Sequence, residues 1–284
     1  NVEPGSGCAT MGYAGVTNWD VQPHNIIQFA AASINQVQIN MSGKTCPVNT
    51  PTSANPYAND APDATIPKGT AFILSSTATD PDAADVLSYS WEQNDDANAS
   101  TQAANSTTTD TKLVGPTFRL YTATASPIRY MPKLEYVLNG QLTTPSNWES
   151  VSNVARDLHF TFTARDNRPG GGQTDIGNAK VTVVTTSGPF EVTSQNTAGI
   201  SYSPASVQSV TWNVNNTDVL PGSTNVDILL STDAGLTFTT NLATAVPNNG
   251  TASVTLPNVN AANCRLMIKP TGNIYYAVNS TPFE

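Results

Sequence analysis

The chain has little charge, no long apolar run and no basic opening, and each shortage excludes a class of protein. It carries 12 Lys and Arg against 21 Asp and Glu, a formal net charge of −9. This balance argues against nucleic acid or an anionic membrane surface as a partner, because each contact would begin from repulsion. No apolar run approaches the roughly 20 residues that span a bilayer, so we expect no membrane insertion. The opening NVEPGSG lacks the features of a signal peptide, and we expect that residue 1 is not the start of the gene product.

Cysteine is scarce as well. The three cysteines form no CxxC pair and no Cys/His cluster, so a structural zinc site is not expected. The economical pairing joins Cys8 to Cys46 and leaves Cys264 as a buried residue of an apolar strand. A disulfide would indicate an oxidising compartment; three free thiols are the alternative.

Uncharged polar side chains take the place of the missing charges. Only 12% of the residues are charged, about half the usual share of a globular protein. A surface rich in Ser, Thr, Asn and Gln favours an extracellular β protein over a cytosolic helical one, so we expect the chain to be secreted, extracellular or at a cell surface. Apolar residues make up 38% of the chain of 284 residues, which is enough for packed cores in two or three domains.

The first segment, residues 1–46, contains the most persuasive helix. The pattern predicts this helix over Ile26–Val37, with Asp20 or Asn25 as its N-cap. Residues 47–62 contain four prolines and no periodicity, which is the composition of a linker. The apolar residues at helical spacing are Ile26, Phe29, Ala30, Ile34 and Val37.

Two longer segments follow, and both predict β-structure. Residues 63–187 alternate apolar and polar side chains in short runs between turn-rich stretches, with Trp91 as a natural core centre. This pattern predicts a cadherin-like or immunoglobulin-like sandwich. Residues 188–284 give about seven strand candidates, the count of an immunoglobulin-like or fibronectin-like domain. The predicted fold class is therefore mainly β: two consecutive immunoglobulin-like antiparallel β-sandwiches preceded by a short turn and helix. The strand candidates of the second sandwich are Phe190–Thr193, Val207–Val214, Val226–Leu230, Leu236–Thr240, Ala252–Leu256, Cys264–Lys269 and Ile274–Val278.

Residues 3–16 read EPGSGCATMGYAGV and precede the predicted helix. They resemble the Met-turn region of metzincin-type zinc metallopeptidases, and more narrowly of the reprolysin-like enzymes that bacteria secrete. The resemblance implies that Met11, with Gly12 and Tyr13, forms the floor of a zinc site and that the helix closes a catalytic domain. An ordinary buried thioether in a turn is the alternative for Met11. Segments that look like the paired β-sandwiches downstream of that protease extend the resemblance over nearly the whole chain: 77–82, 88–93, 162–167, 188–190 and 231–238.

The zinc-binding helix of that family is not found in this sequence. The family motif is HExxHxxGxxH, whereas the two histidines, His24 and His159, lie in no HExxH. Because such a helix needs two histidines one turn apart and a glutamate base, we expect this chain alone to be inactive, with zinc only in the intact parent. Both histidines are expected at the surface.

Two functional hypotheses follow. The first is a non-catalytic C-terminal fragment of a secreted zinc metalloendopeptidase. Its sandwiches would attach the enzyme to a protein or polysaccharide surface or stabilise it, and the missing N-terminal catalytic portion would be a partner. The alternative is a stand-alone extracellular adhesive or ligand-binding module with no protease parent. The helix discriminates between them: in a protease remnant its apolar face is exposed or re-packed against the linker, and in an adhesin the first sandwich covers it.

Calcium is the candidate cofactor of the first sandwich. Asp80, Asp82 and Asp85 fall in one turn, and Asp166 with Asn167 ends a later strand. Loops at one end of an immunoglobulin-like sandwich converge, and clustered carboxylate and amide oxygens are the ligands of calcium. The alternative is ordinary turn chemistry, in which Asp and Asn bond to their own backbone.

Three other features of the sequence have an ordinary structural interpretation that we prefer to a functional one. Residues 231–238 look like an Asp-box hairpin, and a single copy predicts a turn rather than a propeller. Glu92 and Glu149 each follow a tryptophan. Paired carboxylates would suit a glycosidase, but nothing in the sequence brings these two together, and we expect both to be solvated at strand ends.

Overall fold

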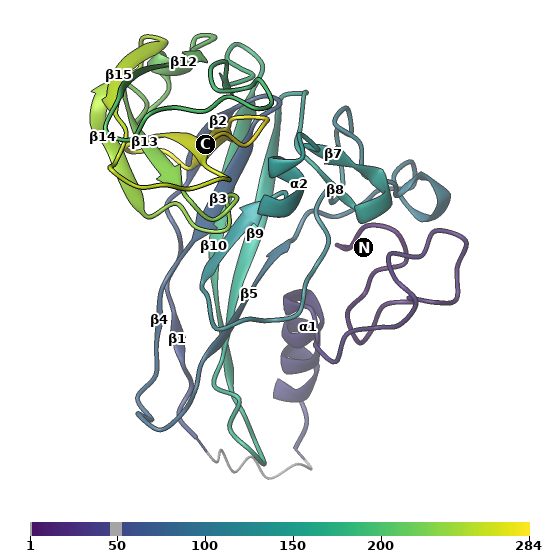
Figure 1. Ribbon diagram of the computed structural model, residues 1–284. Helices are drawn as coiled ribbons and strands as arrows, with labels where there is room; N and C mark the ends of the chain where they lie inside the picture. Colours follow the sequence, from purple (N-terminus) through teal and green to yellow (C-terminus); the bar gives the residue numbers. More distant parts are fainter. Residues whose placement is uncertain (1, 46–52) are drawn as a thin grey trace.

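A computed structural model describes residues 2–45 and 53–284. Residues 2–30 form turns and bends without a strand, and helix α1 (Ala31–Ser42) follows. The rest of the described chain is mainly β, as the alternating pattern predicts. In Figure 1 the N-terminal segment lies beside the first sandwich, away from the second sandwich at the C-terminal end.

The first sandwich is built on a four-stranded sheet in the order β2-β10-β9-β5. Strands β9 and β10 form its long antiparallel hairpin. Along β9 the side chains of Leu158, Phe160 and Phe162 are buried, whereas His159 points outward. Trp91 on β5 packs on Phe162 with 5.0 Å between ring centroids, which confirms it as a core residue. The strands of this sandwich are β1 (Tyr57–Ala58), β2 (Ala64–Pro67), β3 (Ala71–Ser75), β4 (Ala78–Thr79), β5 (Ser88–Gln93), β6 (Ile128–Met131), β7 (Thr143–Thr144), β8 (Glu149–Ser150), β9 (Arg156–Arg165) and β10 (Thr174–Val184).

Short helical turns interrupt the long connections. The connection between β5 and β6 contains η1 (Ala103–Asn105), and helix α2 (Leu134–Leu138) and η2 (Pro145–Asn147) follow β6 and β7. In the second sandwich η3 (Thr217–Val219) follows β12 (Val207–Asn213).

The second sandwich has a three-stranded sheet, β11-β12-β15, and a larger sheet that contains β14, β13, β16 and β17. Six of the seven strand candidates fall on observed strands. The remaining candidate, Leu236–Thr240, does not match a strand over most of its length, because Leu236 is exposed in a turn and β14 begins only at Thr240. The strands are β11 (Glu191–Val192), β12 (Val207–Asn213), β13 (Asn225–Ser231), β14 (Thr240–Pro247), β15 (Thr251–Thr255), β16 (Arg265–Pro270) and β17 (Tyr275–Val278).

One sheet runs through both sandwiches. Strand β17 pairs with β3 through Tyr275–Phe72 and Tyr276–Ala71, so the order of the large sheet is β14-β13-β16-β17-β3-β6. One hydrophobic cluster also contains residues of both halves. The two sandwiches are therefore joined by shared hydrogen bonds and a shared core, a feature that local sequence pattern does not reveal.

The N-terminal boundaries differ from the expected ones. The helix begins at Ala31 rather than near Asn25, and neither Asp20 nor Asn25 caps it; Ala30 occupies the N-cap position without a side-chain bond. Residues 57–58, at the end of the predicted linker, form β1, which pairs with β4. Within the described ranges, no helix is long and apolar enough to cross a membrane.

Candidate functional site

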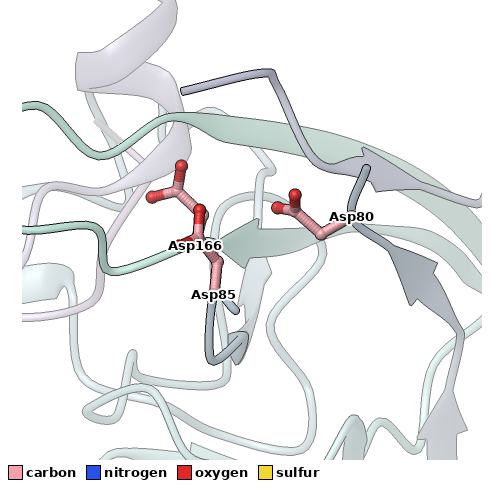
Figure 2. Close-up of side chains that lie close together, drawn as sticks. All are labelled: Asp80, Asp85 and Asp166. Atoms are coloured by element: carbon pink, nitrogen blue, oxygen red, sulfur yellow. The ribbon is translucent and has the colours of Figure 1, made fainter. Parts of the chain in front are cut away.

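The predicted calcium ligands come from two loops that meet at one end of the first sandwich. One carboxylate oxygen from each of Asp80, Asp85 and Asp166 lies within 4.8 Å of the other two. Figure 2 shows the carboxylate of Asp80 directed toward those of Asp85 and Asp166. Asp80 and Asp85 follow β4, and Asp166 follows β9. The convergence of these loops is what places the three acids together.

Asp166 is the most constrained of the three acids. It is buried, and its Oδ1 accepts the backbone N–H groups of Arg168 and Gln173 at 3.1 and 2.9 Å. Burial acts to raise the pKa of this carboxyl, but these N–H groups, the Ser53 hydroxyl and the Arg168 charge outweigh it and lower the pKa. The close approach of the glycine-rich hairpin requires Gly172, where a Cβ would lie 2.8 Å from Asp166 Oδ1.

The other two acids have fewer partners. Asp80 Oδ1 accepts the N–H of Asp82 at 2.7 Å, while Asp80 Oδ2 is buried and has no hydrogen-bond partner among the described residues. Asp85 faces Arg168, whose Nη1 lies 3.2 Å from its Oδ1. A buried carboxylate oxygen without a donor is rare in a folded protein, and it suits a cation that the three acids could share.

Two predicted ligands lie outside this set. Asp82 accepts the N–H of Ala54 at 2.8 Å and lies 3.7 Å from Arg168 Nη1. Asn167 adopts a positive φ of 56° and donates to the carbonyl of Val86 at 2.7 Å. The ordinary turn chemistry weighed for this region accounts for one oxygen each of Asp80 and Asp166, which accept the N–H two residues further on, but it leaves Asp80 Oδ2 without a partner among the described residues.

The segment that resembles a Met-turn is a tight turn held by its own backbone. The N–H of Gly12 donates to Ala9 at 2.8 Å, and that of Tyr13 donates to Ser6 at 2.8 Å. Met11 is 66% exposed, so the alternative of an ordinary buried thioether is wrong. Its role as the floor of a zinc site stays a prediction.

Large apolar side chains gather on the surface of this N-terminal region. Eight of the 18 exposed large hydrophobic residues in the described chain fall within residues 11–41. Met11, Val37 and Met41 line one groove, and we call these three residues the N-terminal apolar face. The face borders a cavity of about 700 Å³ and a shallower groove of about 290 Å³, both lined in part by Met11. The eight residues are Met11, Tyr13, Val16, Ile27, Phe29, Val37, Ile39 and Met41.

The predicted disulfide between Cys8 and Cys46 involves one residue that the structure does not describe. Cys8 is a buried thiol that is free in the described part of the chain, and Cys46 lies outside the described residues. Burial and the charge of Glu3 raise the pKa of Cys8 to about 12, so the thiol stays protonated. Pairing of Cys8 with Cys46 stays a prediction. Cys264 is buried beside β16, as expected.

The simpler readings of two other features are confirmed. His24 is exposed, and the His159 side chain reaches Asp95 at 2.7 Å on the surface. In the Asp-box hairpin, Asp233 bonds to the Ser231 and Thr237 hydroxyls at 2.6 Å. These bonds lower the pKa of Asp233 to about 2, and the hairpin is a turn.

The expectation that Glu92 and Glu149 are solvated was wrong, because both are buried. Glu149 forms a 2.8 Å ion pair with Arg129, and Glu92 lies 3.7 Å from Arg165. Each arginine lies on another strand, so a local motif does not show the pair. Sequence reasoning did not predict that Glu92 accepts the N–H of Ala31 at the start of α1.

Comparisons with known proteins find likenesses among solved structures alone. No family model matches the chain, and no curated protein matches it. Similar solved structures include the N-terminal Ig1-2 module of the Drosophila receptor protein tyrosine phosphatase DLAR, at 9% identity and a TM-score of 0.39, covering 81% of this chain and 100% of that one. The fibronectin(III)-like modules of Clostridium thermocellum CbhA match at 7% identity and a TM-score of 0.25, covering 80% and 94%. Drosophila N-cadherin EC1-3 matches at 11% identity and a TM-score of 0.27, covering 82% of this chain and 68% of that one. Because these identities and TM-scores are low, the likenesses carry no argument about function, which has to be argued from the residues of this chain.

Proposed function

We propose that the chain is an accessory β-sandwich module of a secreted protein, and that its N-terminal apolar face is the contact surface for another domain of the same protein. The observation that carries this proposal is the exposure of α1. Of its 12 residues, all of them described, only Ala31 is buried, while Val37 is 55% and Met41 46% exposed. Apolar side chains gathered on one surface are typical of an interaction site.

The attachment of this region to the first sandwich supports the same proposal. Gln28 accepts the N–H of Ala123 at 2.8 Å, and Arg119 donates to the carbonyl of Val21 at 3.3 Å and to the side chain of Gln22. The region is thus held in place on one side while its apolar face stays open on the other. A stand-alone adhesive module was expected to cover the face of the helix, and the exposure of Val37 does not fit that expectation.

For the identity of the other domain, we propose the catalytic domain of a reprolysin-like zinc metallopeptidase. The turn around Met11, the absence of a strand in residues 2–30 and the helix that follows are consistent with this parent. In such a parent Met11, Gly12 and Tyr13 would form the floor of the metal site, and zinc would supply a polarised water for peptide hydrolysis. The ligands would come from the other part of the protein, because this sequence has no HExxH.

The two sandwiches would act as a rigid support that holds the parent near a protein or polysaccharide surface outside the cell. Calcium is the cofactor we propose for them. The buried Oδ2 of Asp80 and the cluster with Asp85 and Asp166 support this assignment, since calcium binds several hard oxygen ligands. Ser53 bonds to Asp166 and Ala54 to Asp82, so the site would also fix the entry of the chain into the sandwich.

The test compares this chain with a longer product read from the DNA upstream of Asn1. We expect an HExxH motif upstream and zinc-dependent proteolysis by the longer chain. Val37→Asp should leave the melting temperature of this chain nearly unchanged, because Val37 is exposed, yet lower the activity and stability of the longer chain. The matched control is Val207→Asp, an exposed valine of the second sandwich, which should change neither. An upstream sequence without a histidine pair would remove the protease parent, and equal effects of the two variants would remove the contact surface.

A further inference from the structure

Helix α1 depends on a residue of the sandwich for the start of its hydrogen-bond pattern. The first N–H groups of a helix have no partner within it, and a side chain at the N-cap usually supplies one. Here Ala30 holds that position and cannot do so. Instead, Oε2 of Glu92 on β5 accepts the N–H of Ala31 at 2.8 Å. A strand residue 61 positions away thus caps the helix.

Arg165, which lies beside Glu92, also anchors the segment that leads into α1. Arg165 on β9 donates through Nη2 to the carbonyl of Phe29 at 3.1 Å and through Nη1 to the hydroxyl of Ser90 at 2.9 Å. Ala30 and Ala31 are both buried. Because an isolated helix of this length is marginal in water, loss of these contacts would both release and unfold α1.

Glu92 is buried with little charge around it. Arg165 on β9 lies 3.7 Å from its Oε1, and Ser90 and Thr163 approach the same oxygen at 3.4 and 3.5 Å. The other charged group that acts on it is Glu3 of the N-terminal segment, which is repulsive, and α1 itself carries no charged side chain. Burial raises the pKa of Glu92 to about 7, and the bond to Ala31 and the charge of Arg165 reduce this effect without cancelling it.

We propose that Glu92 is a pH-responsive latch between the N-terminal region and the first sandwich, with the protonated carboxyl holding α1 in place and the carboxylate releasing it. Either form accepts the Ala31 N–H, but the carboxylate adds a second buried charge, and Arg165 at 3.7 Å offsets its burial only in part. When α1 leaves, Glu92 becomes solvated and its pKa returns toward the ordinary value. This inference concerns the described chain alone and does not rest on the proposed parent.

The direction of the pH effect follows from proton linkage. The docked state holds the Glu92 proton up to about pH 7, whereas the released state loses it near the ordinary glutamate pKa of 4.5. The docked state therefore binds more protons in this interval, and docking weakens as the pH rises. The docking constant should be greatest below the lower value, fall by about tenfold per pH unit through the interval, and level off above pH 7.

Hydrogen exchange of the α1 amides, expressed as protection factors, tests the latch. In the wild-type chain we expect protection to fall by roughly 100-fold between about pH 5 and pH 8, while the β9 amides keep theirs. Glu92→Gln retains an oxygen that accepts the Ala31 N–H but cannot ionise. Its α1 protection should be flat with pH and should exceed that of the wild type at neutral pH. The matched control is Glu135→Gln on the surface of α2, which should keep the wild-type slope.

Two results would overturn the latch. One is α1 protection that does not change with pH in the wild type, and the other is the same slope in Glu92→Gln. A second measurement needs no variant: the carboxyl carbon shift of Glu92, followed by NMR in the intact chain, should titrate near neutral pH. A midpoint at the ordinary value for glutamate would contradict the proposal even if Glu92→Gln failed to fold.

Discussion

Neutralising Asp80 should stabilise the protein in the absence of calcium and remove most of its stabilisation by calcium. Asp80, Asp85 and Asp166 place carboxylate oxygens within 4.8 Å of one another. At this separation two unit charges repel by roughly 3 kcal/mol at an effective dielectric constant of about 20, and Arg168 beside Asp85 offsets part of it. Asp80→Asn removes one charge but keeps the oxygen that accepts the Asp82 N–H. We therefore expect this variant to melt at a higher temperature than the wild type when calcium is absent.

With calcium present, the wild type should instead melt at a higher temperature than Asp80→Asn. A ligand that binds only the folded state at about 100 times its Kd stabilises it by about 2.7 kcal/mol. For a chain of this size that corresponds to a rise in Tm of roughly 5–11 °C in the wild type. Asp80→Asn should lose most of this rise, because it removes the carboxylate oxygen that has no other partner in the described structure.

Differential scanning calorimetry in millimolar calcium and in chelator measures both effects. The matched control is Asp218→Asn, an exposed acid of the second sandwich, which should keep the full calcium response. A wild-type Tm that calcium does not change, or a full calcium response in Asp80→Asn, would refute a calcium site formed by these three acids.

Three further predictions concern the rest of the chain. Phe72→Ala should cost about 3–5 kcal/mol and lower one common calorimetric transition, because β3 carries Phe72 and joins both sandwiches; two separate transitions would contradict this. The amide protection of Thr237 should be lost as the pH falls from 3.8 toward about 2, since the folded pKa of Asp233 is depressed, and protection that persists in Asp233→Ala would count against the hairpin bonds. This chain alone should not cleave casein with zinc present, and cleavage that a chelator stops would show that prediction to be wrong.

Features that depend on neighbouring residues were predictable from the sequence. The burial of Trp91 and of alternate residues in β9 follows from period-two alternation, and the strands of the second sandwich follow from the same pattern. The meeting of Asp80, Asp85 and Asp166 was also predictable, because sandwich topology brings these loops to one end.

Features that depend on distant residues were not predictable in this way. The start of α1 is set by Glu92, far along the chain, so the local caps Asp20 and Asn25 were misleading. The burial of Glu92 and Glu149 depends on arginines of other strands. The pairing of β17 with β3 joins segments about 200 residues apart, and no local pattern specifies it.

Methionine oxidation tests the proposed contact surface most directly. Met11 and Met41 lie on the N-terminal apolar face, while Met131 and Met267 are buried in the sandwiches and serve as internal controls. With peroxide and mass spectrometry, Met11 and Met41 should oxidise fast in this chain and slowly in the longer upstream-extended product, with the two controls slow in both. If Met11 and Met41 oxidise equally fast in both proteins, no further domain covers this face and the central claim is wrong.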